Sequence, residues 1–89
     1  MLIISNARRL DYFTLTDSEK LGLIETIDKA KEIIEKEYTP DGYNIGINCG
    51  KDAGQSIMHF HCHIIPRYRG DIDNPRGGIR GVIPSKMNY

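Results

Sequence analysis

The chain holds all three of its histidines in one stretch, His59-Phe60-His61-Cys62-His63-Ile64-Ile65. Side chains alternate between the two faces of a β-strand, so the three imidazoles would share one face, with neighbours roughly 6.5–7 Å apart. The apolar side chains between them would lie on the opposite face, where they can pack beneath a helix. We therefore predict a strand over Ile57–Ile65, ended by Pro66. One face of this strand would carry the imidazoles, which are available for chemistry, and the other face would carry core side chains.

A second strand is predicted just before this one. Residues Tyr43–Cys49 alternate, with Tyr43, Ile45 and Ile47 directed to one face. The segment Gly50–Gln55 contains a glycine near each end and reads as a loop. A strand, a glycine-bearing loop and a strand predict an antiparallel hairpin over residues 43–65.

One long helix precedes the hairpin. The sequence Thr16-Asp17-Ser18-Glu19 matches a capping box, in which Thr16 caps the helix and Glu19 reaches back. Pro40-Asp41-Gly42 is typical of a turn, so the helix should end before Pro40. The apolar residues between these signals recur at helical spacing and predict the buried stripe: Leu21, Leu23, Ile24, Ile27, Ala30, Ile33 and Ile34. Opposite charges four residues apart indicate the solvent side: Glu25 with Lys29, and Glu32 with Lys36.

The segments at the two ends complete the predicted architecture. Leu2–Ile4 is apolar and β-branched and reads as a short strand, which starts without lead-in residues. Residues 67–89 are rich in Gly, Pro and Arg and read as an ordered tail or loop. We predict a single α+β domain over residues 1–89, with an antiparallel sheet and one long helix, and with some N-terminal part missing.

Composition narrows the classes of partner. The 89 residues have a formal net charge of zero and 39% hydrophobic residues, which gives no reason to expect a nucleic acid or a membrane as partner. No apolar run approaches a membrane span and no signal peptide is visible, so a cytoplasmic protein is expected. Cys49 and Cys62 form no CxxC pair and are expected to be reduced, half-buried apolar residues. A chain this small is marginal alone and favours a second subunit.

Three interpretations of the histidine row are open. The histidines are structural, or two of them bind zinc with a further ligand from a neighbouring element, or one neutral imidazole attacks an electrophile and forms a covalent adduct. The flanking residues favour the third. Gly54-Gln55-Ser56 brings backbone N–H groups and a hydroxyl to the start of the row, and Asn48 adds a neutral amide, so that a phosphate would meet donors without a basic patch.

These residues resemble a known family. Asp41–Asn48, Ala53–Ser56 and His59–Arg67 together resemble the histidine-triad (HIT) superfamily, whose signature alternates three histidines with apolar residues. Gly70-Asp71 and Asn74–Gly78 resemble bacterial members near the dinucleoside polyphosphate hydrolases. The resemblance implies a HIT-like fold.

The resemblance also implies an activity. It makes His61 the nucleophile of a nucleotidyl-histidine intermediate, His63 the residue near the leaving group and His59 the residue whose backbone orients the nucleophile. Asn48, Gly54 and Ser56 fall where the family contacts phosphates, and Gln55, which keeps its place in the motif, is expected among the substrate-binding residues with them. The reaction implied is two in-line displacements at the α-phosphate of a nucleotide, the second by water, with no metal or other cofactor required.

The implied substrate is a purine nucleotide, either a dinucleoside polyphosphate or a nucleoside phosphoramidate, and family members are typically homodimers. One departure qualifies this expectation. Family domains usually have a helix and strands before the segment that Leu2–Ile4 resembles, so the chain resembles an N-terminally shortened form. Two other functions therefore stay open: a nucleotide-binding module without turnover, and a metal-binding protein that uses the three histidines.

Overall fold

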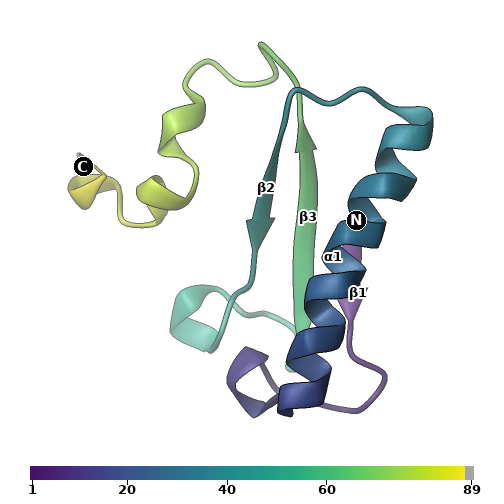
Figure 1. Cartoon of the computed structure of the whole chain (residues 1–89). Coiled ribbons are helices and arrows are strands. Elements are labelled where there is room, and N and C mark those ends of the chain that lie inside the picture. Colours follow the sequence, from purple (N-terminus) through teal and green to yellow (C-terminus); the bar gives the residue numbers. More distant parts are fainter. Residues whose placement is uncertain (88–89) are drawn as a thin grey trace.

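A computed structural model describes residues 1–87 and confirms an α+β fold (Figure 1). Its three strands are β1 (Leu2–Ile4), β2 (Gly42–Gly46) and β3 (His61–Arg67), and its long helix is α1 (Asp17–Glu37). Short 3₁₀ turns fill much of the remainder: η1 (Tyr12–Thr14), η2 (Lys51–Ala53), η3 (Pro75–Gly77), η4 (Ile79–Val82) and η5 (Pro84–Lys86). Within residues 1–87, no helix is both long enough and apolar enough to cross a membrane.

The strands form one antiparallel sheet in the order β1-β3-β2. In its register Leu2 lies opposite His63 and Ile4 opposite His61, and paired residues of an antiparallel sheet point to the same face. The imidazoles therefore share a face with the exposed side chains of β1. The helix α1 packs against the other face, so this one stays open (Figure 1).

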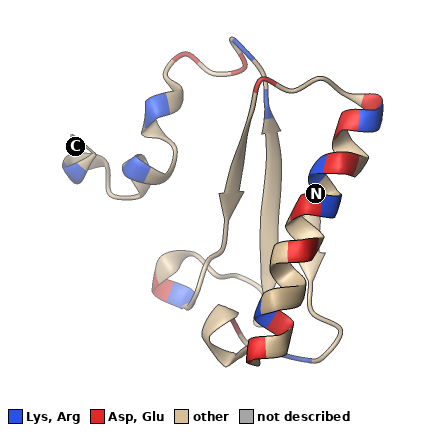
Figure 2. Cartoon of the chain, in the orientation of Figure 1, with Lys and Arg blue, Asp and Glu red and all other residues tan. Residues whose placement is uncertain are grey.

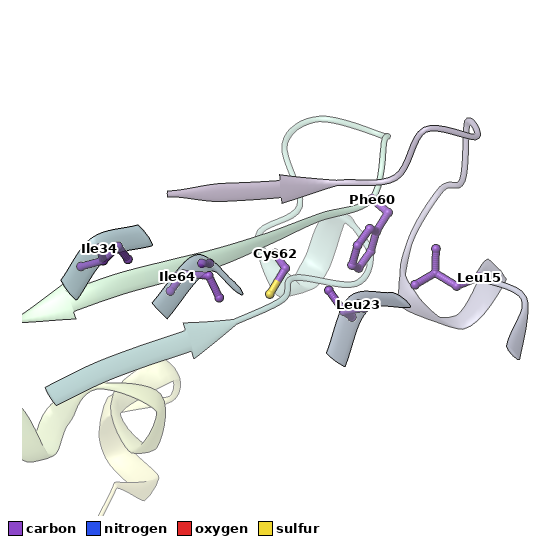
Figure 3. Close-up of a cluster of buried hydrophobic side chains, with 7 residues drawn as sticks. Leu15, Leu23, Ile34, Phe60, Cys62 and Ile64 are labelled. Carbon is purple, nitrogen blue, oxygen red and sulfur yellow. The ribbon is translucent and has the colours of Figure 1, made fainter. Parts of the chain in front are cut away.

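The core lies between α1 and the second face of β3 (Figure 3). The alternation predicted for the histidine stretch is confirmed, because Phe60, Cys62 and Ile64 are all almost completely buried. Burial raises the pKa of the Cys62 thiol, and both cysteines are free, as expected. The buried core consists of these residues: Leu15, Leu23, Ala30, Ile34, Phe60, Cys62 and Ile64.

The buried stripe of α1 is narrower than predicted. Leu23, Ala30 and Ile34 are buried and Ile27 packs against them, at the spacing of a single seam. Three residues expected in the stripe are instead more than half exposed: Leu21, Ile24 and Ile33. Within residues 1–87 the sheet beneath the helix is three strands wide, so it covers this seam and leaves the flanking residues exposed.

The predicted capping box of α1 is confirmed. The Thr16 hydroxyl accepts from the Glu19 backbone N–H at 3.1 Å, and the Glu19 carboxylate accepts from the Thr16 N–H at 2.7 Å. The Thr16 N–H is the main cause of a lowered pKa for Glu19, which also pairs with Arg9 at 3.0 Å.

The ion pair on the exposed side of α1 is Lys31 with Glu35, rather than the two pairs predicted. Glu35 also accepts a hydrogen bond from the Tyr43 hydroxyl of β2 at 2.8 Å. Desolvation, followed by this carboxylate, raises the pKa of Tyr43 to about 12. The helix is thus tied to the sheet by a polar contact beside the apolar seam.

The strand boundaries differ from those predicted. The ladder of β2 ends at Gly46 rather than at Cys49, and β3 begins at His61 and continues through Pro66 to Arg67. Backbone N–H groups alternate in direction along a strand, and that of Ile64 points to β1, where it donates to Met1 at 2.8 Å. The nitrogen of Pro66 faces the same side, beyond the pairing of β1, so proline removes no ladder bond there.

Candidate active site

The three histidines line one hollow of about 420 Å³ on the open face of the sheet. His61 and His63 project from β3, and their ring centroids are 5.2 Å apart with the planes at 81°. His59 lies before the strand rather than in it, because the chain there bonds elsewhere: the next residue, Phe60, donates its N–H to the Arg9 carbonyl at 2.7 Å. The predicted row of three thus consists of two strand residues and one residue of the preceding loop.

The backbone of His59 fixes the ring of His61. His61 Nδ1 lies 2.9 Å from the His59 carbonyl oxygen. A carbonyl oxygen only accepts hydrogen bonds, so Nδ1 carries the proton and, in the neutral ring, Nε2 keeps its lone pair. The nitrogen of the neutral His61 ring that keeps a free lone pair is therefore Nε2.

A serine missed by the sequence analysis fixes His59 in turn. His59 Nε2 lies 3.0 Å from the Ser5 carbonyl oxygen and 3.4 Å from Ser5 Oγ. Ser5 Oγ donates to the Ala7 carbonyl at 2.6 Å, which orients the hydroxyl. Ser5 follows β1 directly but is 54 residues from His59, so sequence spacing gives no signal for the contact.

The loop between β2 and β3 places the polar donors beside the imidazoles. It makes the 3₁₀ turn η2 between Gly50 and Gly54, whose φ angles of 95° and 90° are in the left-handed region that favours glycine. The Asn48 amide donates to the Ala53 carbonyl and holds the turn against the end of β2. A Cβ on Gly54 would come within 3.3 Å of that amide nitrogen. Asn48, Gly54 and Ser56 line the hollow together, which is the location predicted for them.

Gln55 is expected among the substrate-binding residues, but it does not share the position of Asn48, Gly54 and Ser56. Its side chain is only 3% exposed and does not line the hollow. Its Nε2 donates to the carbonyls of Leu10 and Ile57 at 2.6 and 3.1 Å, and its Oε1 accepts from the Gly50 N–H at 2.8 Å. Gln55 is thus a support that ties the loop to the segment before α1 rather than a group presented to a ligand. It is an internal hydrogen-bonding residue, which a loop motif alone does not distinguish from a binding residue.

The walls of the hollow have two kinds of surface. Imidazole, amide, hydroxyl and glycine backbone groups form one part, and the exposed apolar side chains of Leu2, Ile4 and Ile57 form the other. Neither a carboxylate nor a lysine or arginine is among the lining residues of the described chain. Neutral donors beside an imidazole nitrogen with a free lone pair suit an anionic ligand such as a phosphate. Within residues 1–87, no three residues among His, Cys, Asp and Glu are placed to hold a metal ion together.

Comparisons with known proteins agree on one family. The profile of the HIT domain matches residues 1–70. A bis(5'-nucleosyl)-tetraphosphatase of Schizosaccharomyces pombe is 46% identical over 57 residues, which cover 64% of this chain and 31% of that protein. An AP-4-A phosphorylase of Mycobacterium tuberculosis is 35% identical over 72 residues, covering 80% of this chain and 37% of the relative. The chain therefore spans about a third of the length of these relatives.

A solved structure shows the same fold. The crystal structure of a HIT family protein from Bacillus anthracis matches with a TM-score of 0.71 and 37% identity, over 75% of this chain and 48% of that one. The fold described above is thus shared with about half of that HIT family protein.

Proposed function

The chain belongs to the HIT domain family, and from this membership we propose that it is a nucleotide hydrolase or transferase with His61 as its nucleophile. The observation that carries the proposal is the hydrogen bond from His61 Nδ1 to the His59 carbonyl, which leaves Nε2 unprotonated at the hollow. The names of relatives support the class of reaction: one is a dinucleoside tetraphosphatase and another an AP-4-A phosphorylase.

The first proposed step forms a covalent intermediate. The lone pair of His61 Nε2 bonds to the α-phosphorus of the nucleotide while the bond from that phosphorus to the leaving group breaks. The leaving group departs with the electron pair of the broken bond and accepts a proton, which we assign to His63. The ring of His63 lies next to that of His61, with centroids 5.2 Å apart, and this supports the assignment.

The second proposed step releases the nucleotide. A water oxygen bonds to the α-phosphorus as the P–Nε2 bond breaks, its electron pair returns to Nε2, and the proton lost by water goes to His63. Inorganic phosphate in place of water would give a nucleoside diphosphate instead. Both steps proceed without a cofactor.

The remaining site residues would bind the phosphate. We assign this role to Asn48, Gly54 and Ser56, which line the hollow beside the imidazoles. His59 would act through its carbonyl, by orienting His61, and Gln55 would act by holding the loop.

The proposed substrate is a purine nucleotide, either a dinucleoside polyphosphate or a nucleoside phosphoramidate, in a cytoplasmic setting. The active form is proposed to be a homodimer. A core of few buried residues supports a need for a second subunit.

The test is mononucleotide release by the purified chain. Diadenosine tetraphosphate and adenosine 5'-phosphoramidate are each supplied with and without inorganic phosphate, and products are separated by chromatography. His61→Ala should lower turnover by at least about a thousandfold, on the scale seen when a covalent nucleophile is removed. Lys29→Ala, on the exposed side of α1, is the control for a remote substitution.

Two outcomes would contradict the proposal. One is turnover by His61→Ala at the rate of the unsubstituted chain. The other is binding of these nucleotides by the unsubstituted chain with no product at all, which would make the protein a binding module.

A further inference from the structure

The peptide group between His59 and Phe60 makes a hydrogen bond on each of its two sides. Its N–H belongs to Phe60 and donates to the Arg9 carbonyl at 2.7 Å. Its C=O belongs to His59 and accepts from His61 Nδ1 at 2.9 Å. A trans peptide group is planar and its N–H and C=O point in opposite directions, so a contact that fixes one of them also fixes the other. The Arg9 carbonyl therefore acts on the ring of His61 through this one peptide group.

We propose that Arg9 is a positioning residue, which holds the ring of His61 in the orientation that the reaction requires. The inference rests on the proposed function, in which Nε2 of His61 attacks the α-phosphate. Arg9 does not line the hollow that the histidines share, so it acts on the reaction through other residues and not by contact with the substrate.

The strand β3 does not supply this orientation by itself. It begins at His61, which is also where its pairing with β1 ends, so His59 and Phe60 lie outside the ladder. Backbone groups outside a ladder still need hydrogen-bonding partners, and those partners then decide where the groups point. The position of the His59 carbonyl therefore depends on what its neighbours contact.

Those partners lie on residues 5–10, called here the connector. Three of its carbonyl oxygens accept hydrogen bonds from the segment that leads into β3: Ser5 from His59 Nε2 at 3.0 Å, Arg9 from the Phe60 N–H at 2.7 Å, and Leu10 from Gln55 Nε2 at 2.6 Å. His59 is thus held at its ring as well as at its peptide group. The segment before β3 follows the shape of the connector.

The side chain of Arg9 ties the connector to α1. Arg9 Nε donates to both carboxylate oxygens of Glu19, at 3.0 and 3.2 Å. That carboxylate is held in turn, because it accepts from the Thr16 N–H at 2.7 Å in the capping box. The basic stretch of the connector runs beside the acidic first turn of α1 (Figure 2). Hydrogen bonds between charged groups are stronger than neutral ones, so this pair restrains the backbone of Arg9 relative to the helix.

The contacts form one path from the helix to the site. It runs from the Glu19 carboxylate through Arg9 and the peptide group of His59 and Phe60 to the ring of His61. Hydrogen bonds in such a chain polarise one another, so a peptide N–H that donates makes the carbonyl of the same peptide a better acceptor. The path thus favours the proton on Nδ1 of His61 and the lone pair on Nε2.

The test compares two substitutions that each remove one positive charge and one ion pair of α1. Arg9→Met breaks the pair with Glu19, and Lys31→Met breaks the pair with Glu35 on the exposed side of the helix. Arg9→Met should lower kcat for diadenosine tetraphosphate and for adenosine 5'-phosphoramidate by about tenfold to a hundredfold, the scale of a small misplacement of a reacting group. KM should be unchanged, and Lys31→Met should change neither constant.

A conservative variant separates positioning from a general loss of structure. Arg9→Lys keeps a cation that can pair with Glu19, so it should retain most of the kcat that Arg9→Met loses. The methyl resonance of Ala30, which is buried in the core, should be the same in all these variants and reports that the fold is intact.

The tautomer of His61 gives a readout that needs no turnover. In ¹⁵N NMR of the imidazoles, Nδ1 of His61 should carry the proton in the unsubstituted chain and in Lys31→Met. In Arg9→Met the proton should be shared between Nδ1 and Nε2, because the His59 carbonyl no longer has a fixed position.

Four results would overturn the inference while the proposed function stands. They are equal kcat in Arg9→Met and Lys31→Met, a loss confined to KM, an Arg9→Lys protein as slow as Arg9→Met, and an Arg9→Met protein whose His61 keeps the proton on Nδ1. Turnover by His61→Ala at the unsubstituted rate, or no turnover at all, contradicts the proposed function instead, and the tautomer of His61 then decides whether Arg9 positions the ring.

Discussion

At the scale of single residues, Gly54 links backbone conformation to the candidate site. Its φ of 90° and the nearby Asn48 amide leave little room for a side chain. Gly54→Ala should lower the free energy of unfolding by about 1–2 kcal/mol, the cost of a left-handed conformation for a residue with a Cβ. Denaturant unfolding measures the change.

Gly22 provides a control in which the same substitution should raise the free energy of unfolding instead of lowering it. It lies inside α1, and a Cβ there would meet nothing within 4 Å. Gly22→Ala should raise the free energy of unfolding by about 0.5–1 kcal/mol, since alanine loses less backbone entropy in a helix. A Gly54→Ala protein as stable as the unsubstituted chain would show that the turn does not need glycine.

Gln55 offers a second test at this scale. Gln55→Leu leaves the Gly50 N–H and the Leu10 carbonyl without their partner inside the loop. The free energy of unfolding should fall by about 1–3 kcal/mol, the range for a buried polar group left unsatisfied. Ser56→Ala, at the neighbouring exposed position, should change it little; if both variants lose the same stability, Gln55 is not a support.

At the scale of elements, Asp71 ties the C-terminal segment of residues 72–87, called here the tail, to the end of β3: it pairs with Arg67 at 2.8 Å and accepts from the Tyr68 N–H at 2.9 Å. Arg67, followed by the Tyr68 N–H, holds the pKa of Asp71 at about 2. An Asp with a lowered pKa stabilises the folded contact above its unfolded pKa of about 4, and the contribution is lost as the pH falls through about 2. The Tyr68 amide should therefore stay protected from hydrogen exchange from neutral pH down to about 4.

Asp71→Asn should remove that protection throughout the same pH range. Asp73→Asn makes the same change of charge two residues later and should leave the Tyr68 amide protected. Equal exchange in the two variants would show that the ion pair does not anchor the tail.

The elements also show what could be predicted from the sequence. The start of α1 was predicted correctly because a capping box is a local signal, and the core side of β3 was predicted because alternation is local as well. The ends of the strands could not be predicted in this way, since they depend on pairing with distant residues. The strand β3 starts only after Phe60 because the Phe60 N–H donates to the Arg9 carbonyl, and it continues through Pro66 because the nitrogen of Pro66 faces a side where no strand pairs.

The candidate site likewise has residues that a local motif predicts and contacts that no local motif predicts. The places of His61, His63, Asn48, Gly54 and Ser56 on one hollow followed from the motif. The contact of Ser5 with His59 and the buried role of Gln55 depend on segments far apart in the sequence, so no spacing indicated them.

At the scale of the whole molecule, self-association is the property to measure. The chain has a mass of 10.1 kDa, and within residues 1–87 the strand β2 pairs with another strand along one edge only. Sedimentation velocity should give a species of about twice the monomer mass, and the midpoint of thermal unfolding should rise with protein concentration. A monomer whose midpoint is independent of concentration would contradict the proposed homodimer.

The alternation along β3 has a genetic consequence. His61 and His63 line the hollow, whereas Cys62 and Ile64, which alternate with them, are buried in the core, so residues of the two faces are encoded by alternating codons. Duplication or loss of a single codon inside this strand would exchange them, burying imidazoles and exposing Ile64, whereas a change of two codons would preserve the assignment. Viable length variants of the strand should therefore differ by even numbers of residues.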